Sequence, residues 1–343
     1  MTVHTITADG PAGFDAGLPA IAYEQAQDPD EAHRLIRQAC AQGPIALGPH
    51  GPEVLSYELV RTVLRDPRFQ VPKGVALAAQ GITSGRLWDR ATAGLLSRDG
   101  ADHQRLRRLV CTAFTPRSTA RLQTTIVDVI SEVVDPQDMI AHRRHHLTDD
   151  LISELIRSED DGDRLGADEL TMLAATLLMA GTDTTRNQLA AAVGDLCDHP
   201  QQWALLADHP ELAPRAVEEL MRHRPVIFTT MRTASEDVRL GEVTIPAGTL
   251  VMVNTAAANR DPVVYDDPDR LDFTREGPAT MLSFGGGIHY CLGTHLARAE
   301  LAEALAVITQ RMPNPHRAGP APWKPLVGIT GPTTLPIEFD AGH

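Results

Sequence analysis

The sequence predicts a mainly helical domain with a minor β region. Helical periodicity is nearly continuous from His103 to Ile156, and it recurs over Asp168–Leu196, Glu211–His223 and Leu292–Met312. β-type patterns are confined to residues 226–255 and to the C-terminal part. Helices and strands do not alternate regularly, which excludes a doubly wound sheet or an α/β barrel.

The first hundred residues predict short elements followed by a long loop. Residues 1–29 form an irregular lead-in, a helix runs from Asp30 to Gln42, and Pro44–Val54 alternates as a hairpin. Ser56 caps a further helix, Tyr57–Arg65. Residues 68–98 contain glycines at 74, 81, 85 and 94 and predict a partly helical loop, a kind of segment that often carries function.

Later segments predict strands. The candidates are Val226–Phe228, Val238–Leu240, Val243–Ile245, Leu250–Val253 and a C-terminal pair of Leu326–Ile329 with Thr334–Phe339. Pro246 and Gly248 supply a turn before the fourth of them.

Composition excludes several classes of protein. The net charge of −14 disfavours nucleic acid as a partner, since that partner requires a basic face. No apolar run is long enough for a membrane span and the N-terminus lacks a signal pattern, so we expect a cytoplasmic protein. The four cysteines are too widely spaced for a zinc site or a disulfide framework.

One cysteine stands out from the others. Cys291 follows the glycines 285–287 and precedes a helical pattern. Glycines allow close approach of the backbone to a flat ligand, and a helix start favours a thiolate. These are the requirements of a sulfur ligand to haem iron, although a buried structural cysteine at a turn has the same local pattern.

The whole segment resembles the haem-binding loop of the cytochrome P450 family. The matching positions are Phe284, Gly285, Gly287, His289, Cys291 and Gly293, together with Leu292. The resemblance covers roughly residues 30–340, most closely as in soluble bacterial members, and implies one haem-thiolate domain over residues 30–343 with Cys291 as ligand to the iron of haem b.

A second segment resembles the oxygen-binding helix of that family. Ala180–Thr185 places glycine, hydroxyls and a carboxylate inside a long apolar helix, which weakens the helical ladder and opens a groove. The resemblance implies that Thr184 hydrogen-bonds dioxygen and that Asp183 relays protons from solvent. The other interpretation is a kink capped by its own side chains.

Two further groups of residues match the family. Glu219 and Arg222 share a helix face, and the resemblance makes them a buried pair joined by Arg270 beneath the cysteine loop; alone, such a pair is usually a surface salt bridge. The resemblance also assigns His103, Arg107, Arg232 and His289 to the two haem propionates, which would otherwise be buried without partners.

The chain is shorter than the family pattern by several tens of residues. The helix Ser118–Val134 runs through Asp135-Pro136 almost directly into Met139–Arg144, where the family has a further core helix and the two lid helices. We therefore expect a P450 fold shortened between about residues 134 and 139. Three origins stay open: a stretch absent from this sequence, a natural deletion and an engineered one.

The resemblance implies a monooxygenase that inserts one atom of O₂ into a C–H bond of a small apolar substrate. Because no flavin or nicotinamide motif is present, electrons would come from a ferredoxin and its reductase, which would dock near Arg105 and Arg108. A monomer is the default for the family. Two alternatives remain, namely a hydrogen-peroxide-dependent peroxygenase, or a non-catalytic haem-binding protein if the lid is truly absent.

Overall fold

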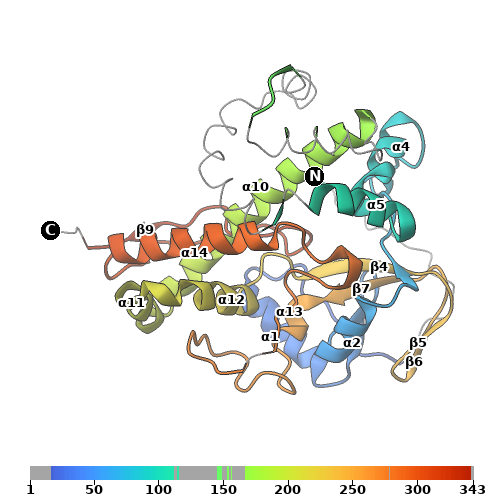
Figure 1. The fold of residues 1–343 in the computed structure, drawn as a ribbon. Helices are drawn as coiled ribbons and strands as arrows, with labels where there is room; N and C mark the ends of the chain where they lie inside the picture. Colours follow the sequence, from blue (N-terminus) through green and yellow to red (C-terminus); the bar gives the residue numbers. More distant parts are fainter. Residues whose placement is uncertain are drawn as a thin grey trace.

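The computed structural model describes residues 17–111, 114–115, 145–148, 153, 156, 167–277 and 279–340. Within these residues the protein is mainly helical with a minor β region (Figure 1). The α-helices are α1 (Pro29–Cys40), α2 (Tyr57–Val63), α3 (Val75–Ala78), α4 (Arg86–Ala93), α5 (Gly100–Cys111), α10 (Ala167–Cys197), α11 (Pro200–Asp208), α12 (Ala213–His223), α13 (Thr255–Ala258) and α14 (Thr294–Arg311). The 3₁₀ turns are η1 (Leu95–Ser97), η4 (Pro210–Leu212) and η5 (Gly287–His289). The strands are β1 (Ile45–Gly48), β2 (Gly51–Val54), β3 (Phe69–Gln70), β4 (Thr229–Ala234), β5 (Val238–Leu240), β6 (Val243–Ile245), β7 (Leu250–Asn254), β8 (His316–Arg317) and β9 (Ile337–Glu338).

The main sheet joins the two halves of the chain. Its strand order is β1-β2-β7-β4-β3, with β2 parallel to β7 and the other neighbours antiparallel. Val54, Val251 and Val253 pack with α2 in a buried apolar core on this sheet. The hairpin predicted over Pro44–Val54 is therefore confirmed, and it is anchored to a strand far downstream.

Helices form a second core beside the sheet. α14 packs against α10, α11 and α12 (Figure 1). Leu196, Trp203, Leu220 and Leu305 fill this core together with Phe284, the residue that precedes the glycines of the cysteine loop. The cysteine loop, residues 284–293, is thereby anchored at its first residue in this helical core.

Two strand predictions are wrong. The strand after Pro225 begins at Thr229, and Ile227 forms only an isolated bridge to Ile329. Residues 326–329 do not pair with residues 334–339; instead β9 pairs with β8. Gly331 has φ +146°, and a Cβ there would lie 2.6 Å from Asn187 Oδ1, so the chain between the two segments is pressed against α10 rather than folded into a hairpin.

Part of the predicted helical stretch after His103 is observed as α5. The expected shortening between about residues 134 and 139 lies outside the described residues. No helix in the described part of the chain is both long and apolar enough to cross a bilayer.

Candidate functional site

The cysteine loop is pressed against the end of α2. Gly285 and Gly287 have φ of +73° and +64°, and a Cβ on Gly287 would lie 2.2 Å from the carbonyl oxygen of Leu64. Only glycine fits there, both for its φ and for this contact. The Cys291 amide donates to the carbonyl of Phe284 at 2.9 Å, so the loop closes on itself between its first residue and the cysteine.

Cys291 is partly buried, just before α14, whose N-cap is Gly293. Burial raises the pKa of the Cys291 thiol, and the Gly293 amide, Arg107 and Arg298 act in the opposite direction. The helix start therefore favours the thiolate as expected, but burial is the larger effect. A bound cation would reverse this balance, because metal coordination deprotonates a thiol outright.

Basic side chains from three elements converge beside this loop. His103 and Arg107 come from α5, Arg232 from β4 and His289 from η5. The rings of His103 and His289 are 4.3 Å apart between centroids, and Arg107 Nη2 donates to the Tyr290 carbonyl at 2.6 Å. The structure thus brings together all four residues that the sequence predicted as one group.

Two of these side chains, His103 and Arg232, are buried and form no ion pair among the described residues. His103 is 1% exposed and Arg232 is 4% exposed. Among the described residues, His103 Nδ1 has no hydrogen-bond partner, and Arg232 forms no ion pair, donating instead to the Met231 carbonyl at 2.8 Å. Burial lowers the pKa of His103 to about 4, with the charges of His289 and Arg107 adding to this. Buried donors in this condition fit the carboxylates of a bound ligand.

The acidic residue in this cluster is Asp99. Its Oδ1 lies 2.9 Å from His289 Nε2, and its Oδ2 accepts from the Val71 amide at 3.0 Å. Sequence reasoning missed Asp99, because it lies outside each motif, although its position directly before α5 and four residues from His103 was a usable signal.

The predicted interruption of the long helix is wrong. α10 is continuous from Ala167 to Cys197, and its hydroxyls bond within the helix. Thr182 donates to the carbonyl of Leu178 at 2.8 Å, and Thr184 to that of Ala180 at 2.5 Å. These bonds satisfy the hydroxyls without opening the ladder.

Asp183 is held by neighbours on the surface of α10. Its Oδ1 accepts from Arg186 Nη2 at 2.6 Å and from Asn187 Nδ2 at 3.1 Å, while Lys324 Nζ lies 4.0 Å away. The Arg186 hydrogen bond is the main cause of the lowered pKa of Asp183. Nearby Met179 is 72% exposed, so this part of α10 is open in the structure.

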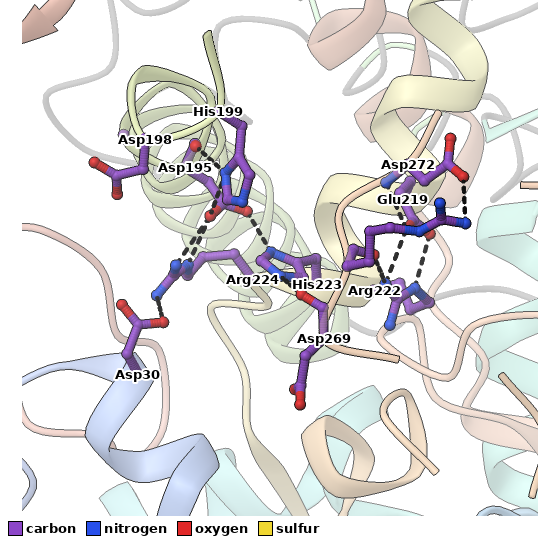
Figure 2. Close-up of polar contacts among 12 residues, drawn as sticks. Asp30, Asp195, Asp198, His199, Glu219, Arg222, His223, Arg224, Asp269 and Asp272 are labelled. Carbon is purple, nitrogen blue, oxygen red and sulfur yellow. Dashed lines mark hydrogen bonds and ion pairs between the residues drawn. The ribbon is translucent and has the colours of Figure 1, made fainter. Parts of the chain in front are cut away.

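Glu219 and Arg222 form the predicted buried pair (Figure 2). The predicted third member, Arg270, is wrong. Arg222 donates to both carboxylate oxygens, at 2.7 and 2.8 Å. The arginine that joins them is Arg275, whose Nε lies 3.3 Å from Glu219 Oε1. Arg270 instead extends outward, its side chain 60% exposed and paired with Asp272, and only its backbone carbonyl accepts from Arg222 and Arg275.

A second buried ionic cluster was not predicted at all. Asp195, near the end of α10, contacts His223 Nδ1 at 2.6 Å and Arg224 Nη2 at 2.9 Å (Figure 2). Burial alone would raise the pKa of Asp195, but the charges of Arg224 and His223 outweigh it and hold this pKa below its usual range. The cluster ties α10 to the end of α12 and has no contact with the cysteine loop among those described.

Comparison with known proteins gives one consistent family. The family model "Cytochrome P450" matches residues 117–208 and 206–312. Luteothin monooxygenase of Streptomyces thioluteus is 33% identical over 383 aligned positions, covering 91% of this chain and 93% of that protein. Mycinamicin IV hydroxylase/epoxidase of Micromonospora griseorubida is 34% identical, with 85% of this chain and 91% of that protein covered.

Solved structures agree with these relatives. Cytochrome P450 CYP109Q5 from Chondromyces apiculatus superposes with a TM-score of 0.82 at 29% identity, covering 95% of this chain and 99% of that one. The alignment of 383 positions with the Streptomyces protein is longer than the 343 residues of this chain, so that protein has residues with no counterpart here. The shortness predicted from the sequence is thereby confirmed.

Proposed function

This chain belongs to the cytochrome P450 family, and we propose that it is a monooxygenase in which Cys291 is the axial ligand of its cofactor, haem b. The haem, once bound, supplies activation of dioxygen and oxygen transfer to a C–H bond. The observation that supports this best is that His103 and Arg232 are buried beside the cysteine loop and that neither forms an ion pair among the described residues. In this proposal His103, Arg107, Arg232 and His289 hold the two propionates.

Besides the four residues proposed for the propionates, the glycines and Cys291 are proposed to hold the porphyrin ring. Gly285 and Gly287 hold the loop backbone in left-handed conformations, and the missing side chain of Gly287 lets the loop pack on the carbonyl of Leu64. Gly293 N–H hydrogen-bonds the sulfur of Cys291 and limits how much negative charge it carries. Glu219, Arg222 and Arg275 brace the backbone below the loop.

Thr184 and Asp183 are proposed to manage protons. Because the Thr184 hydroxyl donates its proton to the Ala180 carbonyl, its lone pairs are left to accept a hydrogen bond from a ligand. Asp183 can relay a proton only after it has bound one, and the Arg186 contact opposes that step. We therefore expect Asp183 to leave Arg186 during proton transfer.

Electrons are proposed to come from a separate ferredoxin with its reductase. The expected dock around Arg105 and Arg108 lies on α5, but Arg105 is already paired with Glu169 of α10. That pairing reduces the positive charge that Arg105 offers to an acidic partner. We propose a cytoplasmic monomer that meets its electron donor transiently.

The substrate is proposed to be a small, largely apolar molecule. A cavity of about 210 Å³ lies between α4 and α10, lined by Ala93 and Met172 together with Arg86, Asp89, Arg90 and Glu169. Its charged lining differs from the Ala- and Leu-rich character of residues 70–96 and supports a substrate with one polar end.

The test begins with the haem-loaded protein reduced under carbon monoxide. The wild type should show the red-shifted Soret band of a thiolate-ligated complex, and Cys291→Ser should lose it. Cys111→Ser, at an exposed cysteine, serves as the matched control and should keep the band. A wild-type complex with the band of imidazole ligation would contradict the assignment of Cys291.

A second measurement separates the proposal from its two alternatives. Substrate-dependent NADH consumption with a ferredoxin system is expected of the monooxygenase. Turnover driven only by hydrogen peroxide would select the peroxygenase, and neither activity, with the haem bound, would select the non-catalytic haem protein.

A further inference from the structure

Asp99 uses both carboxylate oxygens to join two distant segments of the chain. One oxygen accepts from the Val71 amide at 3.0 Å and the other lies 2.9 Å from His289 Nε2. The carboxylate is followed directly by α5, whose first residue, Gly100, has φ +64°. Asp99 thus stands where the end of β3, the start of α5 and the cysteine loop meet.

The hydrogen bond between Val71 and Asp99 joins the two ends of a long segment of the chain. Residues 71–98 leave the sheet after β3, form α3, α4 and η1, and return at Asp99. Val71 is the first residue of this segment and Asp99 directly follows its last, so their hydrogen bond ties its two ends together.

The segment is also packed against itself. Gly74 has φ +59°, and a Cβ on it would lie 2.4 Å from the ring of Trp88, so the indole rests directly on the backbone of the first half. Thr92 Oγ1 donates to the Trp88 carbonyl at 2.8 Å within α4. Because the two ends of residues 71–98 are hydrogen-bonded and its two halves are in contact, we expect this segment to move as one unit.

The other oxygen of Asp99 contacts His289, which belongs to the proposed cofactor site. His289 lies two residues before Cys291 and its ring is 4.3 Å from that of His103. Any displacement of residues 71–98 that moves Asp99 therefore changes the position of His289 directly. A charge-assisted hydrogen bond of this kind is about twice as strong as a neutral one, which makes it suited to transmitting such a displacement.

We propose that Asp99 is a positioning residue that couples residues 71–98 to the cysteine loop through His289. A molecule that contacts residues 71–98 is thereby sensed at His289 and the cysteine loop. This inference rests on the proposed haem ligation by Cys291 and adds to it a connection that the ligation itself does not need.

The experiment compares two azoles on haem-loaded protein with Asp99→Asn. Imidazole reaches only the iron, whereas clotrimazole is large enough to contact the surrounding chain. We expect D99N to weaken clotrimazole about ten-fold, equivalent to about 1.4 kcal/mol, because residues 71–98 must then be ordered by the ligand. Imidazole affinity should change less than two-fold.

Asp102→Asn is the matched control. Asp102 lies on the same helix, but its side chain is 68% exposed and pairs with Arg98. D102N should leave both azole affinities unchanged. Equal weakening of both azoles by D99N would mean that Asp99 only maintains the haem site, and no weakening of either would mean that there is no coupling; each result overturns the proposal.

Amide hydrogen exchange on the wild-type holoenzyme decides the matter even if D99N does not take up haem. Clotrimazole, compared with imidazole, should slow exchange both in residues 71–98 and in residues 285–290. Imidazole, which is too small to order residues 71–98, controls for any effect of iron ligation itself on residues 285–290. Slower exchange confined to residues 71–98 would overturn the coupling, whereas failure of the proposed function would appear separately as the wrong carbon-monoxide spectrum.

Discussion

The two regions that the proposed mechanism needs are built very differently. Beneath the cysteine loop, Glu219 and Arg222 are buried and multiply hydrogen-bonded. In the middle of α10, Asp183 is on the surface, and Met179 is 72% exposed. The first region is held by a buried hydrogen-bonded network, and the second is exposed and, among the described residues, held only by neighbours on its own helix and by Lys324. In the proposed function, the buried network lies on the side of the cysteine loop and the exposed helix carries the proton-transfer residues.

The largest expected effect concerns the corrected arginine. Arg275→Ala removes a partner of buried Glu219 and the donor to the carbonyls of Asp266 and Asp267. We expect the free energy of unfolding, measured by urea denaturation, to fall by about 3 kcal/mol. Arg270→Ala is the matched variant in the same loop, and its exposed pair predicts a loss below about 0.5 kcal/mol. A larger loss of stability from Arg270→Ala than from Arg275→Ala would contradict Arg275 as the buried partner of Glu219.

An intermediate effect is expected from a buried histidine. His33 on α1 is 3% exposed, its Nε2 has no partner among the described residues, and burial, aided by the charge of Arg260, lowers its pKa well below the usual value. The unfolded chain therefore binds a proton at about pH 6.5 that the folded protein rejects, and stability is lost as the pH falls below that value.

The measurement is the pH dependence of urea unfolding between pH 6.5 and 5.5. The wild type should lose about 1 kcal/mol more over this range than His33→Phe, which cannot take up the proton. His209→Phe, at an exposed histidine, should follow the wild type. Parallel curves for the wild type and H33F would show that His33 is protonated in the folded state.

The smallest effect on stability, and the most informative for the mobile side, is expected from Arg186→Gln. The exposed pair with Asp183 predicts a change in unfolding free energy below about 0.5 kcal/mol. Without Arg186 the pKa of Asp183 should rise toward its ordinary value, so Asp183 should bind a proton more readily. The amount of product formed per NADH consumed should therefore increase at neutral pH. Unchanged coupling would indicate that Asp183 does not carry the proton.

Local patterns in the sequence predicted what depends on local chemistry. Short motifs predicted three features that the structure contains. They are the glycines before Cys291, the pair of Glu219 with Arg222, and the grouping of His103 with His289. The choice of Arg275 over Arg270 was not predictable, because both arginines lie in one loop and only its three-dimensional turn decides which points inward. The pairing of β9 with β8 depended likewise on the packing of Gly331 against Asn187.

The same limit applies to Asp99 and Asp195. Each acts through partners that are far away in the sequence, His289 for the first and His223 for the second. Periodicity places each residue on its own element but cannot state which distant side chain it will meet. Sequence reasoning therefore predicted the cysteine loop but not the long-range contacts that hold it.

The parallel pairing of β2 with β7 has a consequence for how the protein is made. Residues of the N-terminal part pair with residues far downstream: Glu53 and Val54 with Met252 and Val253, and Phe69 with Ala234. During synthesis the N-terminal hairpin therefore leaves the ribosome long before its partner strand exists, and such non-local pairing slows folding. The sheet is completed only shortly before the cysteine loop itself emerges, so haem capture is expected to be among the last events of biosynthesis.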